Sequence, residues 1–305
     1  MIDLAGLLER TSRTFALSIP RLPEPTRLAV TLAYLLFRIA DTFEDAAVWP
    51  RERRVEVLVD FMALLDQQNQ SPDGRPPARA TDVARHWSAL RPSEHQGYVD
   101  LVAATPGVLD AVAGLSPASR AVVLRHASRT AEGMRRFVEN SYEDGTLDLS
   151  SLEELRDYCY VVAGIVGELL TDLFLLDAPA LQASAHALRS RARDFGEGLQ
   201  LVNILKDVSD DARDGRTYLP PDTDRSEILA LARADLASAA EYVLTLQRGG
   251  APRGFVEFTA LPVLLAVETL ALLERDGPGA KLPRERVMTL VSELDARLDV
   301  GAPAL

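Results

Sequence analysis

Apolar residues recur every three or four positions through most of the chain, a period typical of helices with one buried face. No sustained alternation of apolar and polar residues between turn residues occurs, which argues against a substantial sheet. The pattern therefore predicts an all-α fold. The expected helices cover Leu4–Thr14, Glu24–Ala46, Arg51–Asp66, Thr81–Leu90, Gln96–Ala104, Pro117–Asn140, Ser151–Leu175, Leu181–Ala212, Ser226–Gln247, Phe255–Glu274 and Arg284–Leu298.

The breaks between these helices are short and polar. Pro72–Pro77 is the most loop-like segment, yet it is too short to link two domains. The sequence contains no repeat of fixed period, although two acidic motifs occur far apart. We therefore expect residues 1–305 to form a single all-α domain.

The first of these motifs to consider is the stretch Gly198–Tyr218. Its polar residues Gln200, Asn203, Asp207 and Asp211 follow one another at spacings of three, four and four. Side chains at these spacings stack on one helix face. The apolar residues around them imply that the helix is largely buried, and a buried row of carboxylates is unfavourable unless a cation neutralises it. Mg²⁺ commonly binds one or two carboxylates together with substrate phosphates. The motif therefore predicts a metal–phosphate site.

A second polar helix face occurs in Ala33–Asp45, where Tyr34, Arg38, Asp41 and Asp45 lie four, three and four residues apart. A single pair of aspartates at this spacing is more commonly a solvated helix end. Two apolar helices with such a stripe favour a shared function. Two facing pairs of aspartates can hold several Mg²⁺ ions between them, and these ions can bind a diphosphate leaving group.

Composition narrows the possible partners. Hydrophobic residues make up 47% of the 305 residues, charged residues 26%, and the net charge is −12. This acidic balance argues against binding to nucleic acid or to an anionic membrane. An anionic substrate would need local cations, and Lys206, Arg213 and Arg216 beside the second aspartate pair are suitable. Cys159 is the only cysteine, which excludes an intramolecular disulfide, and four scattered histidines make a zinc site improbable.

The chain carries no clear targeting signal. Its N-terminus lacks the basic start and long apolar core of a signal peptide. The apolar run Phe255–Leu273 contains Glu257, Pro262 and Glu268, so we expect a buried or cavity-lining helix rather than a membrane anchor. We expect a soluble, cytoplasmic protein, for which peripheral membrane contact during product release stays open. The sequence carries no signal for an oligomeric state.

Four segments in order resemble the successive motifs of the squalene/phytoene synthases. They are SRTF at Ser12–Phe15, YLLFRIADTFED at Tyr34–Asp45, YCYVVAGIVGELL at Tyr158–Leu170 and GLQLVNILKDVSDDARDGRTYLP at Gly198–Pro220. FTALPVLLAVETL at Phe258–Leu270 is similar to a later helix of squalene synthases. The resemblance implies an all-α isoprenoid synthase fold around a central cavity. It also implies Mg²⁺-dependent head-to-head condensation of two prenyl diphosphates through a cyclopropyl diphosphate intermediate.

The resemblance also assigns roles to individual residues. It implies two or three Mg²⁺ ions bound by Asp41, Asp45, Asp207 and Asp211. It implies catalytic roles for Tyr158, Tyr34, Arg38 and Tyr218. The expected substrate-binding residues are Ser12, Arg13, Phe15, Arg38, Gln200, Asn203, Lys206, Arg216 and Gly164. Lys206 stands where arginine is common, so a point charge replaces a bidentate donor. Gly164 and Gly167 suit either passage of a polyprenyl chain or tight helix packing.

The family contains enzymes with different substrates and products. The motifs favour a squalene-type enzyme that condenses two farnesyl diphosphates through presqualene diphosphate. Reduction by NADPH would give squalene, and the chain would then bind NADPH without a Rossmann motif; the sequence does not identify the reductant. A phytoene synthase using two geranylgeranyl diphosphates stays open, as do enzymes that form dehydrosqualene or hydroxysqualene. From other classes, a noncatalytic helical binding protein and a metal-dependent diphosphate hydrolase remain alternatives.

Overall fold

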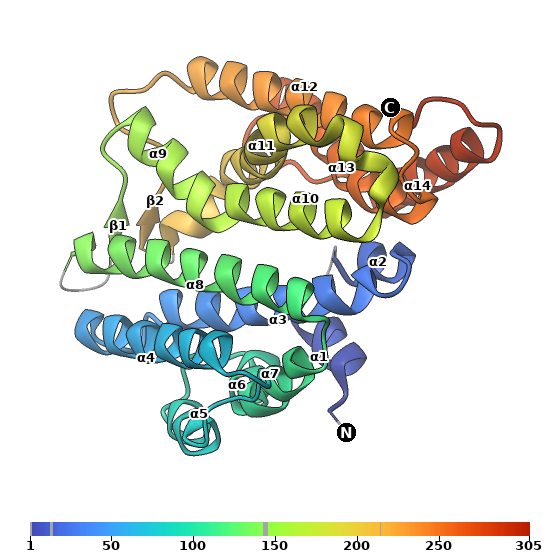
Figure 1. Cartoon of the computed structure of the whole chain (residues 1–305). Helices are drawn as coiled ribbons and strands as arrows, with labels where there is room; N and C mark the ends of the chain where they lie inside the picture. Colours follow the sequence, from blue (N-terminus) through green and yellow to red (C-terminus); the bar gives the residue numbers. More distant parts are fainter. Residues whose placement is uncertain (1, 13–14, 143–145, 214) are drawn as a thin grey trace. The chain divides into compact units, whose positions relative to one another are not determined.

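The computed structural model describes residues 2–12, 15–142, 146–213 and 215–305 (Figure 1). Helices account for most of these residues, which confirms the predicted all-α fold class. The helices are α1 (Leu4–Thr11), α2 (Phe15–Ser18), α3 (Thr26–Glu44), α4 (Arg51–Gln70), α5 (Ala80–Ala89), α6 (Gln96–Ala103), α7 (Thr105–Ala113), α8 (Pro117–Asn140), α9 (Leu152–Cys159), α10 (Ile165–Asp177), α11 (Ala185–Arg213), α12 (Arg225–Arg248), α13 (Arg253–Asp276) and α14 (Arg284–Asp299). Shorter elements are the 3₁₀ turns η1 (Ile19–Arg21) and η3 (Pro179–Ser184), the π-helical segment η2 (Tyr160–Gly164) and the strands β1 (Leu147–Asp148) and β2 (Arg216–Thr217).

The chain divides into two compact units. Unit 1 consists of Met1–Ile19 with Glu24–Thr146, and unit 2 of Pro20–Pro23 with Leu147–Leu305. The chain therefore enters unit 2 briefly at Pro20–Pro23 before returning to unit 1. The single domain expected from the sequence stays a prediction.

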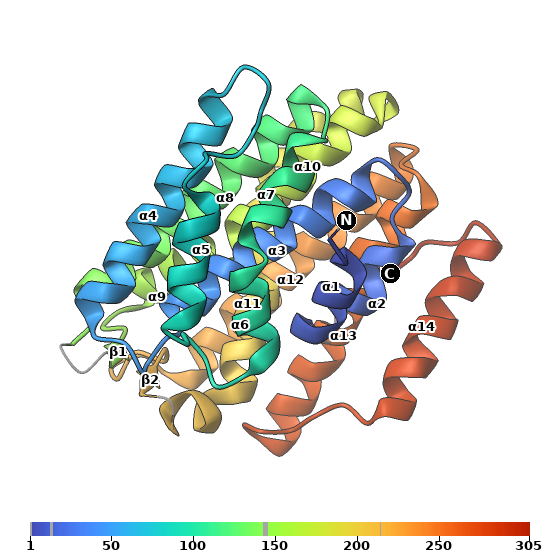
Figure 2. The same ribbon diagram turned by 90° about the horizontal axis from the view of Figure 1, so that it is seen from below.

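In unit 1, α3 packs against α8, and α4 packs against α8 as well. Helices α5, α6 and α7 pack on one another, and α6 and α7 also contact α3 (Figure 2). Phe43, in the last turn of α3, lies in an aromatic cluster: its ring centroid is 4.9 Å from that of Trp87 and 6.1 Å from those of Phe61 and Trp49. Buried aromatic pairs of this kind contribute strongly to packing. The cluster thus holds the end of α3, where Asp41 and Asp45 lie.

In unit 2, α11 is the longest helix and packs against α12, α10 and η2. Glycines allow its backbone to touch its neighbours. A Cβ atom at Gly196 would overlap the carbonyl oxygen of Ala163, and one at Gly167 would overlap that of Ala192. Both positions therefore require glycine for this packing, which sets the distance between α11 and the helix beside it.

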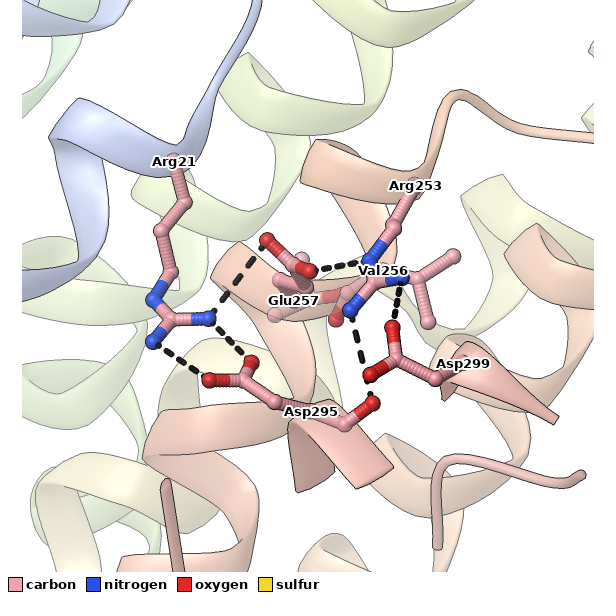
Figure 3. Close-up of polar contacts among 7 residues, drawn as sticks. Arg21, Arg253, Val256, Glu257, Asp295 and Asp299 are labelled. Carbon is pink, nitrogen blue, oxygen red and sulfur yellow. Dashed lines mark hydrogen bonds and ion pairs between the residues drawn. The ribbon is translucent and has the colours of Figure 1, made fainter. Parts of the chain in front are cut away.

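An ion-pair network attaches the segment Pro20–Pro23 to α13 and α14 (Figure 3). Arg21 Nη1 lies 2.6 Å from Asp295 Oδ1 and 3.5 Å from Glu257 Oε2. Arg253 Nε donates to Glu257 Oε1 at 2.5 Å, and its Nη1 donates to Asp299 Oδ1 at 2.5 Å. Glu257 thus forms ion pairs with two arginines, one on each side, at the junction of these helices (Figure 3).

Several predicted helix bounds require correction. The first helix ends at Thr11, before the expected Thr14. The helix expected over Ser151–Leu175 is interrupted by the π-helical segment η2. Helix α7 was not predicted; its proline, Pro106, lies in the first turn, where the missing N–H costs nothing. The beginning of the helix expected from Leu181 is a 3₁₀ turn.

Two helical stretches of the described residues are long and apolar enough to cross a membrane by length and composition. They are Leu152–Asp177 and Arg253–Asp276, and 61% of the most apolar window is buried within the protein in each. Core helices of soluble proteins meet the same criterion, so this observation is weak evidence for a membrane span. The second stretch contains the run expected to be a buried helix.

Candidate active site

Arg38 and Asp41, one turn apart on α3, form an ion pair in unit 1. The Arg38 guanidinium carbon also lies 5.7 Å from the ring centroids of Tyr34 and Tyr98. The Asp41 carboxylate raises the pKa of Arg38 above its ordinary value, although burial opposes this effect. Among the described residues, Arg38 Nε is buried and has no hydrogen-bond acceptor. Arg38 is therefore a cation held between a carboxylate and two aromatic rings, with one buried N–H donor left unpartnered by the described residues.

The other residues predicted in unit 1 gather near the end of α1. The Tyr34 hydroxyl donates to the Thr11 carbonyl oxygen at 2.7 Å, and its ring centroid lies 5.6 Å from that of Phe15. Ser12 Oγ accepts a hydrogen bond from the Phe15 N–H at 3.0 Å. Tyr34 thus anchors the segment that includes Ser12 and Phe15, while its catalytic role stays a prediction. Arg13 lies outside the described residues.

Both aspartate pairs lie toward the C-terminal ends of their helices. Asp41 and Asp45 occupy the last turn and the C-cap of α3, and Asp207 and Asp211 precede the end of α11 at Arg213. The C-terminal end of a helix carries partial negative charge. The helix dipole therefore adds to the field of the carboxylates, and both ends attract cations.

The second aspartate pair is less buried than expected. The buried residues of α11 end at Leu205; Asp207 and Asp211 are half-buried, and Asn203 is exposed. The helix is buried as far as Leu205, but the expectation of a buried row of carboxylates is wrong, because the last two turns of α11 lie beyond its packed part. Partial exposure keeps these carboxylates hydrated and lowers the cost of their charge.

The cations predicted beside this pair have specific partners. Lys206 Nζ lies 3.2 Å from Asp207 Oδ2 and donates to Asn203 Oδ1 at 3.4 Å. Arg213 forms an ion pair with the exposed Asp210 rather than with the predicted stripe. Gln200 is half-buried one turn before Asn203. Lys206 thus contacts Asp207, a predicted metal ligand, directly.

A small pocket in unit 2 brings several predicted residues together. It is lined by Ile204, Val208, Asp211, Ala212, Arg216, Thr217, Tyr218 and Leu219. Strand β2 pairs in parallel with β1, so that Leu147 lies opposite Arg216 and Asp148 opposite Thr217. This pairing holds Arg216, and Tyr218 two residues later, beside β1, which leads into α9.

Tyr158, at the end of α9, meets Tyr218 of the pocket wall. The two rings stack with centroids 4.7 Å apart at 29°, and their hydroxyl oxygens lie 3.0 Å apart in a hydrogen bond. Both side chains are buried. The resemblance assigned these tyrosines separately, and only the structure shows that they form one pair.

Gly164 and Gly167, for which the sequence left substrate passage or helix packing open, both lie at tight contacts. A Cβ at Gly167 would overlap the Ala192 carbonyl oxygen, which supports helix packing as its role. At Gly164 a Cβ would clash with the Tyr160 ring and lie 3.4 Å from Glu197 Oε1. Packing therefore accounts for both, and the assignment of Gly164 to substrate binding stays a prediction.

Two residues near the predicted set were missed by the sequence analysis. Tyr98 of α6 faces the Arg38 guanidinium, and Thr11 accepts from Tyr34. No local pattern marks Tyr98, because its position depends on how α6 packs on α3. The structure thus assembles Tyr34, Arg38 and Asp41 in unit 1, and Tyr158, Asp211, Arg216 and Tyr218 in unit 2. The expectation that the two aspartate pairs face each other across one cavity stays a prediction.

The donor chemistry of both pairs fits a hard divalent cation. Each pair supplies carboxylate oxygens one helical turn apart, and Mg²⁺ is usually held by one or two carboxylates plus substrate phosphates and water. Within the described ranges, no group of three or more His, Cys, Asp or Glu side chains is arranged to hold a metal ion by itself. If Mg²⁺ binds, Asp41, Asp45, Asp207 and Asp211 are the residues that would hold it.

The all-helical fold has counterparts among solved structures. The structure is similar to that of TcSQS bound to a ligand, with a TM-score of 0.69 and 24% identity over 98% of this chain and 88% of that chain. It is also similar to a dehydrosqualene synthase bound to a ligand, with a TM-score of 0.63 and 20% identity over 97% of this chain and 95% of that chain. At these identities the similarity establishes the all-helical fold and no activity.

The family follows from the sequence match. The squalene/phytoene synthase family model matches residues 8–224, and the chain belongs to this family. The chain is 28% identical over 292 residues to the squalene synthase of Eremothecium gossypii and 26% identical over 295 residues to that of Schizosaccharomyces pombe. These matches cover 88% of the chain in each case, but only 60% and 59% of the length of the two relatives.

Proposed function

We propose that this protein catalyses the Mg²⁺-dependent head-to-head condensation of two farnesyl diphosphates, through presqualene diphosphate, to squalene, with NADPH as the reductant. The observation that carries the proposal is the hydrogen-bonded pair of Tyr158 and Tyr218 at a pocket that also contains Asp211 and Arg216. The family match spans both aspartate pairs and both tyrosines.

Departure of the diphosphate is the step for which the charged residues are suited. Ionisation of an allylic diphosphate creates an anionic leaving group and a carbocation, and preorganised cations stabilise the anion. Arg38, held by Asp41, and Lys206, held by Asp207, offer fixed positive charge in a chain of net charge −12. Bound Mg²⁺ would add Lewis-acid stabilisation of the diphosphate oxygens.

The tyrosine pair is suited to proton transfer. In a hydroxyl–hydroxyl hydrogen bond one oxygen donates and the other accepts, so the accepting hydroxyl keeps its own proton for another acceptor. Tyr158 and Tyr218 can therefore relay a proton: one hydroxyl takes the proton that the carbocation loses, while the other gives its own proton to a diphosphate oxygen, so that the pair ends neutral. Their burial keeps bulk water from the pair, as a carbocation requires.

The reaction product is tested directly by incubating the purified protein with farnesyl or geranylgeranyl diphosphate, with and without NADPH, and identifying products by mass spectrometry. Squalene formed only with farnesyl diphosphate, Mg²⁺ and NADPH is the expected result. Formation of dehydrosqualene or hydroxysqualene in the presence of NADPH would contradict the proposed reduction to squalene. Formation of phytoene would show that the substrate is geranylgeranyl diphosphate rather than farnesyl diphosphate. Free farnesol with diphosphate would indicate a hydrolase. Absence of product under every condition would favour a noncatalytic binding protein.

A further inference from the structure

Glu197 of α11 is the most completely buried acidic side chain near the candidate site, with 0% exposure. It forms an ion pair with Arg193 one turn earlier on the same helix. Its second oxygen, Oε2, lies 3.5 Å from Arg156 Nη2 of α9. An isolated charge at such a position would be strongly unfavourable, so the two arginines are needed to keep Glu197 in place.

The two arginines reach the chain on either side of Tyr158. Arg156 precedes it by two residues on α9. The Arg193 guanidinium carbon lies 4.7 Å from the ring centroid of Tyr160, two residues after it. The Tyr160 hydroxyl in turn donates to Glu168 Oε1 at 3.2 Å. The Glu197 carboxylate thus contacts the chain directly at Arg156, two residues before Tyr158, and is connected through Arg193 to Tyr160, two residues after it.

The backbone conformation after Tyr158 makes the orientation of the Tyr158 side chain sensitive to the contacts of Arg156 and Arg193. The π-helical segment η2 begins two residues later, with the Ile165 N–H bonded to the Tyr160 carbonyl oxygen. π turns are rare, occur often at functional sites and alter the course of a helix. Because Gly196 of α11 has no side chain, the η2 backbone at Ala163 can lie directly against the α11 backbone. The orientation of Tyr158 therefore depends on how α9 and η2 dock on α11, next to Glu197.

Stability alone does not explain this network. Asp194 and Asp235 lie close enough to affect the same groups, and Arg156 and Arg193 act on both Glu197 and Asp235. Burial raises the pKa of Glu197 despite its pairing with Arg193. Replacement of a buried ion pair by apolar residues is often neutral or stabilising. The network is therefore better understood through the geometry that it imposes.

We infer that Glu197 is a positioning residue for Tyr158: through Arg156 and Arg193 it sets the rotation of α9 and η2 that brings the Tyr158 hydroxyl to Tyr218. This inference rests on the proposed function where it is tested by enzyme kinetics. Glu197 itself contacts neither tyrosine hydroxyl in the described contacts, and its effect on catalysis is indirect.

The test compares Glu197→Gln with Glu257→Gln. Glu257 is a matched control because it is also largely buried, with 12% side-chain exposure, and also forms ion pairs with two arginines, yet it belongs to the network of α13 and α14 (Figure 3). We expect Glu197→Gln to lower kcat by roughly 10-fold or more with KM for the prenyl diphosphate within about 2-fold. Glu257→Gln is expected to keep kcat within about 2-fold, even where its melting temperature falls equally.

A second readout does not require enzymatic activity. The protein has seven tyrosines, so ¹⁹F NMR of fluorotyrosine-labelled protein can resolve Tyr158, assigned with Tyr158→Phe. Its resonance should shift in Glu197→Gln and in Arg156→Met, stay in place in Glu257→Gln, and return toward the wild-type position in Glu197→Asp. Arg156→Met removes a partly exposed side chain and keeps the test valid if Glu197→Gln does not fold.

The outcomes separate the two proposals. A shifted Tyr158 resonance in a protein without synthase activity would support the positioning role and reject the proposed function. An unshifted resonance in both Glu197→Gln and Arg156→Met would overturn the positioning role, whatever the activity. Equal effects of Glu197→Gln and Glu257→Gln on kcat and on the resonance would also overturn it, because they would indicate a general loss of stability.

Discussion

Asp41 and Asp207 each combine partial exposure with a basic partner on their own helix. Neither carboxylate packs in the apolar core, so its amide analogue should be accommodated. We expect Asp41→Asn and Asp207→Asn to lower product formation by roughly 100-fold or more, because the leaving group loses electrostatic stabilisation. Circular dichroism and thermal melting should stay close to wild type.

The control for these variants is Asp210→Asn. Asp210 lies on the same helix as Asp207 but is exposed and pairs with Arg213. It should retain wild-type turnover at saturating Mg²⁺. Wild-type turnover in Asp41→Asn or Asp207→Asn would reject the assignment of these side chains as metal ligands.

The tyrosine pair leads to a second prediction. Tyr158→Phe and Tyr218→Phe each keep the stacked ring and remove one hydroxyl, so each should lower kcat by roughly 10- to 100-fold without unfolding the protein. Tyr242→Phe is the matched control, since Tyr242 is also buried and its hydroxyl is bonded to that of Thr171 at 2.9 Å. Steady-state kinetics of the three variants checks this; loss of activity in Tyr242→Phe alone would contradict it.

Asp235 of α12 carries a proton more tightly than an exposed aspartate. It is 6% exposed, and no hydrogen bond reaches its Oδ2 from the described residues. Burial and the nearby charge of Asp194 raise the pKa of Asp235 to about 7. The charge of Glu197 acts in the same direction, while Arg156 and Arg193 oppose it. The folded protein therefore binds more protons than the unfolded chain between about pH 4 and pH 7.

This difference predicts the pH dependence of stability. Stability from protonated Asp235 is fully present below the unfolded pKa near 4 and is lost as pH rises toward 7, by roughly 2 to 4 kcal/mol. Asp235→Asn cannot titrate, so it should lack this part of the decline and be the more stable form at pH 8. Urea unfolding of both proteins at pH 5 and pH 8 measures the difference. Equal slopes with pH in the two proteins would show that Asp235 does not carry the proton.

Among the helices, the contact of α11 with η2 depends on a missing side chain. A Cβ at Gly196 would overlap the carbonyl oxygen of Ala163, which belongs to the backbone and has no rotamer through which to move away. We expect Gly196→Ala to lower the free energy of unfolding by about 3 kcal/mol, as overpacking does. Gly114→Ala, at an ordinary helical φ of −76° at the end of α7, should change it by less than about 1 kcal/mol. Denaturant unfolding of both variants checks this, and equal values would contradict the close contact.

Helix bounds were predictable where local signals mark them. Helix α8 begins at Pro117 and ends at Asn140 as expected, because Ser116 caps its N-terminus and proline fits the first turn. The π-helical segment η2 carried no such signal, since its apolar residues continue the pattern of the flanking helices. The interruption follows from the backbone contact with α11, which is a tertiary feature.

For the whole molecule, net charge and site charge have opposite signs. The chain carries −12, so an anionic substrate is attracted only where basic side chains are fixed locally. Arg38 and Arg216 fulfil this condition through different neighbours: Arg38 through Asp41 and two aromatic rings, Arg216 through the pairing of β1 and β2. The sequence identified both arginines, but their surroundings came from the packing of distant segments.

The all-α class, the helix faces that carry the aspartate pairs and the family were determined by the sequence itself. These features depend on residues three or four positions apart, or on short motifs, and such spacings have the same meaning in any helix. Only the tertiary structure decided that Tyr158 bonds to Tyr218, that Arg38 meets Tyr98 and that Glu197 is held by Arg156. Each of these pairs joins residues more than 40 positions apart, and their contact depends on the packing of helices and on the short β1–β2 pairing, which no local pattern specifies.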